Sequence, residues 1–127
     1  LLSTTLALAI AGCAQAPQAP TGLMDVAERP AEKALLAGLR AYDDALYPQA
    51  EAQLRQALQT GLAAAKDRAA AHKHLAFIAC TSQRIAECEA AFRAAREADP
   101  GFALVKAEAG HPLWGPVYRR VLPSASP

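Results

Sequence analysis

The chain has 127 residues, which suffices for one small domain with a buried core. Hydrophobic residues make up 53% of it but aromatic residues only 6%. Alanine supplies much of the apolar content, and this composition favours closely packed helices. The 13 basic and 12 acidic residues leave a net charge of +1, which gives no case for nucleic-acid binding, since that requires a concentrated basic face.

The N-terminal apolar stretch, residues 6–11, ends abruptly in small residues and Cys13. Only 12 positions precede this cysteine, whereas a transmembrane helix needs about 18 or more apolar residues. The run Ile10-Ala11-Gly12-Cys13 resembles the lipobox of bacterial lipoproteins. The resemblance implies that residues 1–12 are part of a signal peptide and that Cys13 carries diacylglycerol and an acylated amino terminus. The alternative is an ordinary buried cysteine at the end of a short hydrophobic helix.

Residues 13–29 are expected to form a lipidated, flexible tether, because the run AQAPQAPTG after Cys13 contains proline and glycine but no large apolar residue. Several acyl chains would hold the protein on a bilayer. Ala14, and not aspartate, follows the cysteine. By resemblance to Gram-negative lipoprotein sorting, this implies the periplasmic face of the outer membrane. Residues 123–127 are expected to be a disordered tail.

Helical spacing of apolar residues begins after Pro30, a residue that suits the first turn of a helix. A first helix is predicted over 31–47 and a second over 48–62, with Pro48 at their boundary. The apolar stripes contain Leu35, Leu36, Leu39, Tyr42 and Leu46 in the first helix and Ala50, Leu54, Ala57 and Leu58 in the second.

Two further helices are predicted over 66–80 and 84–98, the latter stopped by Asp99-Pro100-Gly101. No alternating strand pattern competes with them. The sequence therefore predicts an all-α domain over 30–122, made of two antiparallel helical hairpins and a C-terminal capping segment.

The spacing of one apolar set is repeated further along the chain: Tyr47, Ala50, Leu54 and Ala57 match Ile85, Cys88, Phe92 and Ala95. This pattern resembles the second helix of a tetratricopeptide (TPR) repeat. Gly38 and Ala76 fall where the repeat has a small residue in its first helix, and Pro100 falls at its closing proline. The offset between the two copies exceeds the TPR repeat length of about 34 residues, so an extra turn is expected near 63–68. The alternative is an ordinary helical bundle whose alanine-rich faces mimic the pattern.

Two cysteines, Cys80 and Cys88, remain if Cys13 is lipidated. A tight hairpin brings such positions together, and a disulfide requires Cα atoms within about 7 Å. In an oxidising periplasm we expect the bond to form. The alternative is two small, buried, reduced residues; the spacing is not the C-x-x-C of redox proteins.

Other candidate chemistry is weak. His72 and His74 point to different sides of a helix, so no metal site is expected and solvated histidines are the simpler interpretation. Asp43-Asp44 is interpreted as a solvated helix end. The sequence has neither a glycine-rich phosphate loop nor a Ser/His/Asp constellation at suggestive spacing. We therefore expect no enzyme activity, no cofactor and no small-molecule substrate.

The C-terminal run EAGHPLWGPVYRR, residues 108–120, contains the single tryptophan, Trp114, framed by proline and glycine. A short helix is expected to carry Val117, Tyr118 and Val121. The favoured interpretation is a terminal plug that covers the last hairpin, since the end of a repeat array needs apolar cover. The alternative is a surface anchor for a partner, because aromatic residues often dominate interfaces.

Together with the lipobox, the runs LAFIACTSQRIAECEAAFRAAREADPGF and AEAGHPLWGPVYRRV resemble the small TPR-containing lipoproteins associated with bacterial type VI secretion systems. The likeness extends from Cys13 to about Val121. It implies a protein-binding adaptor or assembly factor that meets a protein partner in the cell envelope and contacts the membrane through its lipid anchor. Two alternatives are a general envelope scaffold outside secretion and a small redox or metal protein that uses Cys80, Cys88 and the histidines.

The candidate partner-binding residues follow from correspondence with the groove-facing positions of TPR helices, with the tryptophan added as a candidate anchor. They are Glu32, Leu35, Leu39, Tyr42, Lys73, Phe77 and Trp114.

Overall fold

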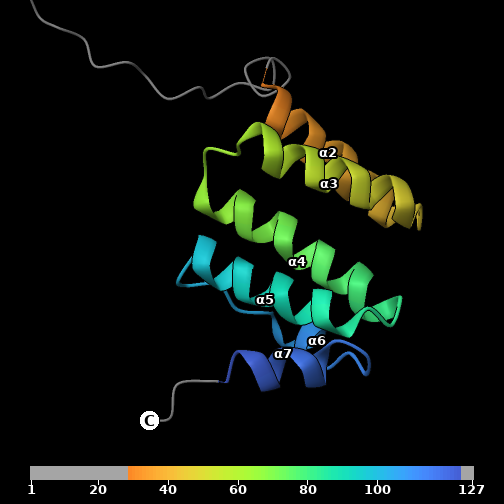
Figure 1. Ribbon diagram of the computed structural model, residues 1–127, viewed down its shortest axis with the longest axis vertical. Coiled ribbons are helices and arrows are strands. Elements are labelled where there is room, and N and C mark those ends of the chain that lie inside the picture. The colour runs from red at the N-terminus through yellow and green to blue at the C-terminus, as the bar shows by residue number, and fades with distance from the viewer. Residues whose placement is uncertain (1–28, 124–127) are drawn as a thin grey trace, which may run out of the picture.

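The computed structural model describes residues 29–123, in which two helical pairs are followed by two short helices (Figure 1). The helices are α2 (Pro30–Asp43), α3 (Tyr47–Thr60), α4 (Ala65–Thr81), α5 (Ile85–Ala98), α6 (Lys106–Ala109) and α7 (Gly115–Val121). Helix α2 packs on α3 and α4 packs on α5, while α4 also contacts α3 and joins the two pairs. The predicted all-α fold of two packed hairpins is confirmed.

Proline sets several of the helix boundaries. Pro30 is the first residue of α2 and Pro48 lies in the first turn of α3, where the missing N–H costs no helical hydrogen bond. Helix α5 ends at Ala98, immediately before Asp99 and Pro100. Most predicted boundaries are therefore within two residues of the observed ones.

The end of the first helix is the exception, because α2 stops at Asp43 and not at Tyr47. Ala45 has a left-handed backbone with φ of +59°. The Ala45 N–H donates to the carbonyl of Tyr42, and the Leu46 N–H donates to that of Ala41. This pair of bonds is a Schellman motif, which closes a helix and reverses the chain. Leu46 consequently leaves the predicted apolar stripe and is 47% exposed; Leu36, placed on the same stripe, is also exposed.

The same turn joins α4 to α5 in the second pair. Gln83 has φ of +61°; its N–H donates to the carbonyl of Cys80, and the Arg84 N–H donates to that of Ala79. The second helices of the two pairs, α3 and α5, both have 14 residues. Of the first helices, α2 has 14 residues and α4 has 17. The additional residues lie at the start of α4, within the predicted 63–68.

Three of the four residues in each copy of the repeated apolar set lie at the centre of a helical pair, whereas the first members, Tyr47 and Ile85, are exposed. Ala50, Leu54 and Ala57 of α3 are fully buried, and so are the equivalent Cys88, Phe92 and Ala95 of α5. Cys80 and Cys88 form a disulfide with their Cα atoms 5.2 Å apart, as the hairpin geometry predicts. The bond fastens the end of α4 to the first turn of α5.

The C-terminal part covers the second pair. Phe102, Leu104 and Val117 are buried and join the same apolar cluster as Phe92. Helix α7, which carries the expected Val117, Tyr118 and Val121, packs against α5. The ring centroid of Tyr118 lies 5.4 Å from that of Phe92, so the predicted cover of the last hairpin is present.

Candidate partner-binding face

A row of aromatic rings crosses one face of the molecule, from the end of α2 and the start of α3 over α4 to the C-terminal segment. Consecutive rings have centroids between 3.4 and 5.7 Å apart. In order along the face, this aromatic row consists of Tyr47, Tyr42, His74, Phe77, Trp114 and His111. Two of these six, Tyr42 and Phe77, come from predicted groove-facing helix positions, and they lie 6.4 Å apart. The structure therefore brings together residues from both hairpins and the C-terminal segment.

His74 is a structural part of this row and corrects the expectation of a solvated histidine. Its ring packs edge-on against Tyr42 at 5.0 Å, and its Nδ1 lies 2.8 Å from the carbonyl oxygen of Ala70, which requires Nδ1 to donate. Burial lowers the pKa of His74 and raises the pKa of Tyr42. Both side chains are consequently held neutral at pH 7.

Lys73 supplies the charge on this face. Its Nζ lies 2.8 Å from Oε2 of Glu108 and 5.8 Å from the ring centroid of Phe77. Glu108 lies 35 residues further along the chain. The pair therefore cannot be predicted from the spacing of residues within one helix. Glu108 and the two histidines of the row were not predicted as site residues from the sequence.

Trp114 lies flat on Phe77, with ring centroids 4.0 Å apart, and its Nε1 donates to the carbonyl of Glu108 at 2.7 Å. The ring of His111 stacks on Trp114 at 3.4 Å. Trp114 is therefore engaged within the chain, as the plug interpretation predicts.

The predicted partner-binding residues differ in accessibility. Leu35 and Phe77 are only 6% and 3% exposed, so both belong to the core and are removed from the candidate surface. Leu39, Tyr42, Lys73 and Trp114 are half-buried and remain accessible. Glu32 is also half-buried and lies 3.7 Å from the guanidinium of Arg29.

A groove of about 490 Å³ runs along another side of α4, between α3 and α5. Its lining includes Leu58 of α3, Leu75 and Ala79 of α4, and Ala91 of α5. His72 also lines it, and burial lowers the pKa of this histidine. His72 and His74 thus face different surfaces, and within residues 29–123 no three or more ligand-type side chains cluster as a metal site would require.

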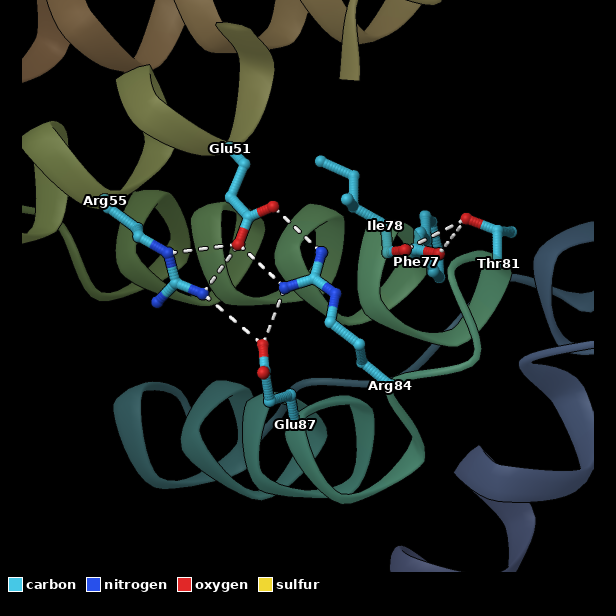
Figure 2. Close-up of polar contacts among 7 residues, drawn as sticks. All are labelled: Glu51, Arg55, Phe77, Ile78, Thr81, Arg84 and Glu87. Carbon is cyan, nitrogen blue, oxygen red and sulfur yellow. Dashed lines mark hydrogen bonds and ion pairs between the residues drawn. The ribbon is translucent and has the colours of Figure 1, made fainter. Parts of the chain in front are cut away.

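An ion cluster beside this groove ties the two helical pairs together. Figure 2 shows the carboxylate of Glu51, on α3, between the guanidinium groups of Arg55 and Arg84. Arg84 donates to both oxygens of Glu51, at 3.0 and 2.9 Å, and also to Glu87 at 2.7 Å. The hydrogen bonds from Arg84, and to a smaller extent those from Arg55, outweigh desolvation and lower the pKa of Glu51 to about 2. The sequence pattern does not predict this cluster either, because it joins residues 33 positions apart.

Several predicted features fall outside residues 29–123, among them Cys13, the signal peptide, most of the tether and the last four residues of the tail. Within the described range, no helix has the length and apolar character needed to cross a membrane. The Cys80–Cys88 disulfide is typical of an oxidising, extracytoplasmic compartment.

No protein-family model, curated protein or solved structure matches this chain.

Proposed function

We propose that this protein is a lipid-anchored, protein-binding adaptor on the periplasmic face of the outer membrane, acting in the assembly of a type VI secretion system. The observation that carries the proposal is the repeated helical pair. Both pairs are closed by the same hydrogen-bonded turn and bury the last three of the four residues in the repeated set. Such repeated pairs build extended surfaces for binding other proteins, and the resemblance to TPR repeats supports this use.

The compartment is supported by two independent features of the chain. The Ile10-Ala11-Gly12-Cys13 run resembles a lipobox, and the buried Cys80–Cys88 bond suits an oxidising environment. Both features agree with a protein that is exported and then held on a membrane by acyl chains at Cys13.

The surface offered to the partner consists of Leu39, Tyr42 and Lys73, next to the point where Trp114 covers Phe77. Aromatic rings provide apolar area with few rotatable bonds, and the Lys73 amine provides a directed charge. This combination suits a peptide or helix of an envelope protein.

The lipid anchor is tested by expressing the full precursor in a Gram-negative host that carries a type VI secretion system and by feeding radiolabelled palmitate. We expect label in the wild type and none in Cys13→Ala. A wild-type protein without label would contradict the anchor.

The adaptor role is tested by crosslinking and pull-down from detergent-solubilised membranes. We expect an envelope component of the secretion apparatus to be recovered with the wild type, less with Lys73→Glu, and normally with Lys33→Glu, a charge reversal at an exposed position of α2. Recovery of general outer-membrane assembly proteins in its place would favour the scaffold alternative. Recovery independent of Lys73 would remove this face from the proposal.

A further inference from the structure

Residues 105–114, here called the strap, connect two anchored points of the C-terminal part. Leu104 before the strap and Val117 after it are buried. The backbone N–H of Leu104 donates to the hydroxyl of Tyr118 at 3.2 Å, so the two ends of the strap are held near each other. None of the strap residues is itself buried, and Val105 and Leu113 are 62% and 53% exposed.

The strap reaches α4 through two side chains. Glu108 pairs with Lys73 at 2.8 Å, and Trp114 stacks on Phe77 at 4.0 Å. A hollow of about 240 Å³ remains between α4 and residues 99–108, lined by Ala70 and Lys73 on one side and Val105 and Glu108 on the other. The strap therefore lies over the face without filling the space beneath it.

One of these two contacts, the ion pair between Lys73 and Glu108, contributes little to stability. The side chains of Lys73 and Glu108 are 23% and 24% exposed, and partly solvated ion pairs contribute little to stability. Segments with few buried apolar contacts open locally more readily than the core. The anchored ends allow the strap to lift without unfolding Phe102, Leu104 or Val117.

We propose that the strap is an intramolecular occupant of the partner-binding face, displaced when a partner peptide that carries an aromatic ring and a carboxylate binds Phe77 and Lys73. The strap itself shows which chemistry fits this face. Glu108 pairs with the Lys73 amine, and the ring of Trp114 covers the ring of Phe77, which would be exposed without it. A partner segment must match both groups, because removing the strap leaves a half-buried cation and a core aromatic ring uncovered. The inference rests on the proposed binding face and specifies its ligand and its regulation.

The first test is hydrogen exchange on the purified full-length protein in detergent. We expect the amides of residues 106–111 to exchange at least about a hundred times faster than the amides in the middle of α4 and α5, with those of residues 118–121 protected. Strap amides as protected as those of α5 would overturn the proposal.

The second test is an NMR titration with the acetylated, amidated peptide VKAEAGHPLW, the strap's own sequence. The receptor is the variant Glu108→Gln/Trp114→Ala, and the matched control is Leu113→Ala, which changes an exposed strap residue.

We expect the Lys73 and Phe77 signals of the double variant to shift at peptide concentrations about ten-fold lower than in the wild type or the control. The reason is that the strap of the double variant lacks the two side chains that compete with the peptide for Lys73 and Phe77. The same peptide with glutamine for glutamate and alanine for tryptophan should cause no shift. An equal response of variant and wild type, or unchanged Lys73 and Phe77 signals in the variant, would overturn the proposal.

The outcome is separable from that of the adaptor role. If the peptide binds the double variant but no envelope partner is recovered from cells, the secretion role fails and the strap mechanism stands. If an envelope partner binds the wild type and the double variant equally, the strap mechanism fails and the adaptor role stands.

Discussion

Gly38 of α2 and Leu54 of α3 pack so closely that a β-carbon at position 38 would lie 2.9 Å from Cγ of Leu54 and 3.2 Å from its backbone nitrogen. Leu54 is completely buried, which restricts its freedom to move aside. The glycine therefore permits the contact between the two helices of the first pair, in the place where the sequence pattern requires a small residue.

Gly38→Ala should destabilise the domain although alanine is the better helix former. The clash costs about 1–3 kcal/mol, and the better helix propensity of alanine offsets about 1 kcal/mol of it, so a net loss of up to about 2 kcal/mol is expected in urea denaturation. In a Leu54→Ala background the side-chain contacts are removed and only the 3.2 Å contact with the backbone nitrogen remains, so the same glycine substitution should cost less or become neutral. A loss of equal size in both backgrounds would show that Leu54 is not the cause.

Reduction of the Cys80–Cys88 disulfide should lower the free energy of unfolding. The bond closes a short loop, with a sequence separation of 8, for which chain entropy predicts about 2–3 kcal/mol. Urea denaturation with and without a strong reductant measures the difference. The double variant Cys80→Ala/Cys88→Ala, whose buried positions accept alanine, should be less stable than the oxidised wild type and insensitive to the reductant.

The parts of the fold that could be predicted from the sequence depend on local periodicity. The buried set at Ala50, Leu54 and Ala57, and its copy in α5, follow from helical spacing. The end of α2 could not be predicted in this way, because Leu46 continues the apolar period and the left-handed residue of the turn is an alanine, not the glycine that usually marks it.

The candidate face was only partly predictable for a different reason. Correspondence with TPR helices identified Tyr42, Lys73 and Phe77, which lie within one neighbourhood. The same correspondence could not show that Glu108 pairs with Lys73, because this contact depends on how the chain returns after α5. Burial of Phe77 under Trp114 likewise depends on a long-range contact and not on any spacing within α4.

The Glu51 carboxylate should make stability depend on pH below the usual carboxyl range. Its folded-state pKa is lowered to about 2 from 4.5, so the stabilisation is complete above about pH 5 and is lost as the pH falls towards 2. Glu51→Gln should cost about 1–2 kcal/mol at pH 7, and the difference from wild type should shrink as the pH approaches 2. Thermal denaturation at pH 7, 4 and 2.5 measures this difference. Glu97→Gln, which removes an exposed carboxylate with no ion pair among residues 29–123, should be nearly neutral at pH 7; an equal loss in both variants would contradict the special role of Glu51.

The two Schellman turns should both be improved by glycine. Ala45 and Gln83 hold left-handed conformations, φ of +59° and +61°, which cost an L-residue with a side chain about 1–2 kcal/mol. Glycine avoids this strain but gains more conformational entropy on unfolding, so Ala45→Gly and Gln83→Gly should each stabilise by about 0.5–1 kcal/mol in urea denaturation. Because the turns belong to different helical pairs and share no hydrogen-bond partner, the two gains should add in the double variant. Ala86→Gly, at an exposed helical position in the first turn of α5, is the matched control and should destabilise by up to about 1 kcal/mol. A loss of stability at either turn would mean that its side chain contributes more than the backbone strain costs.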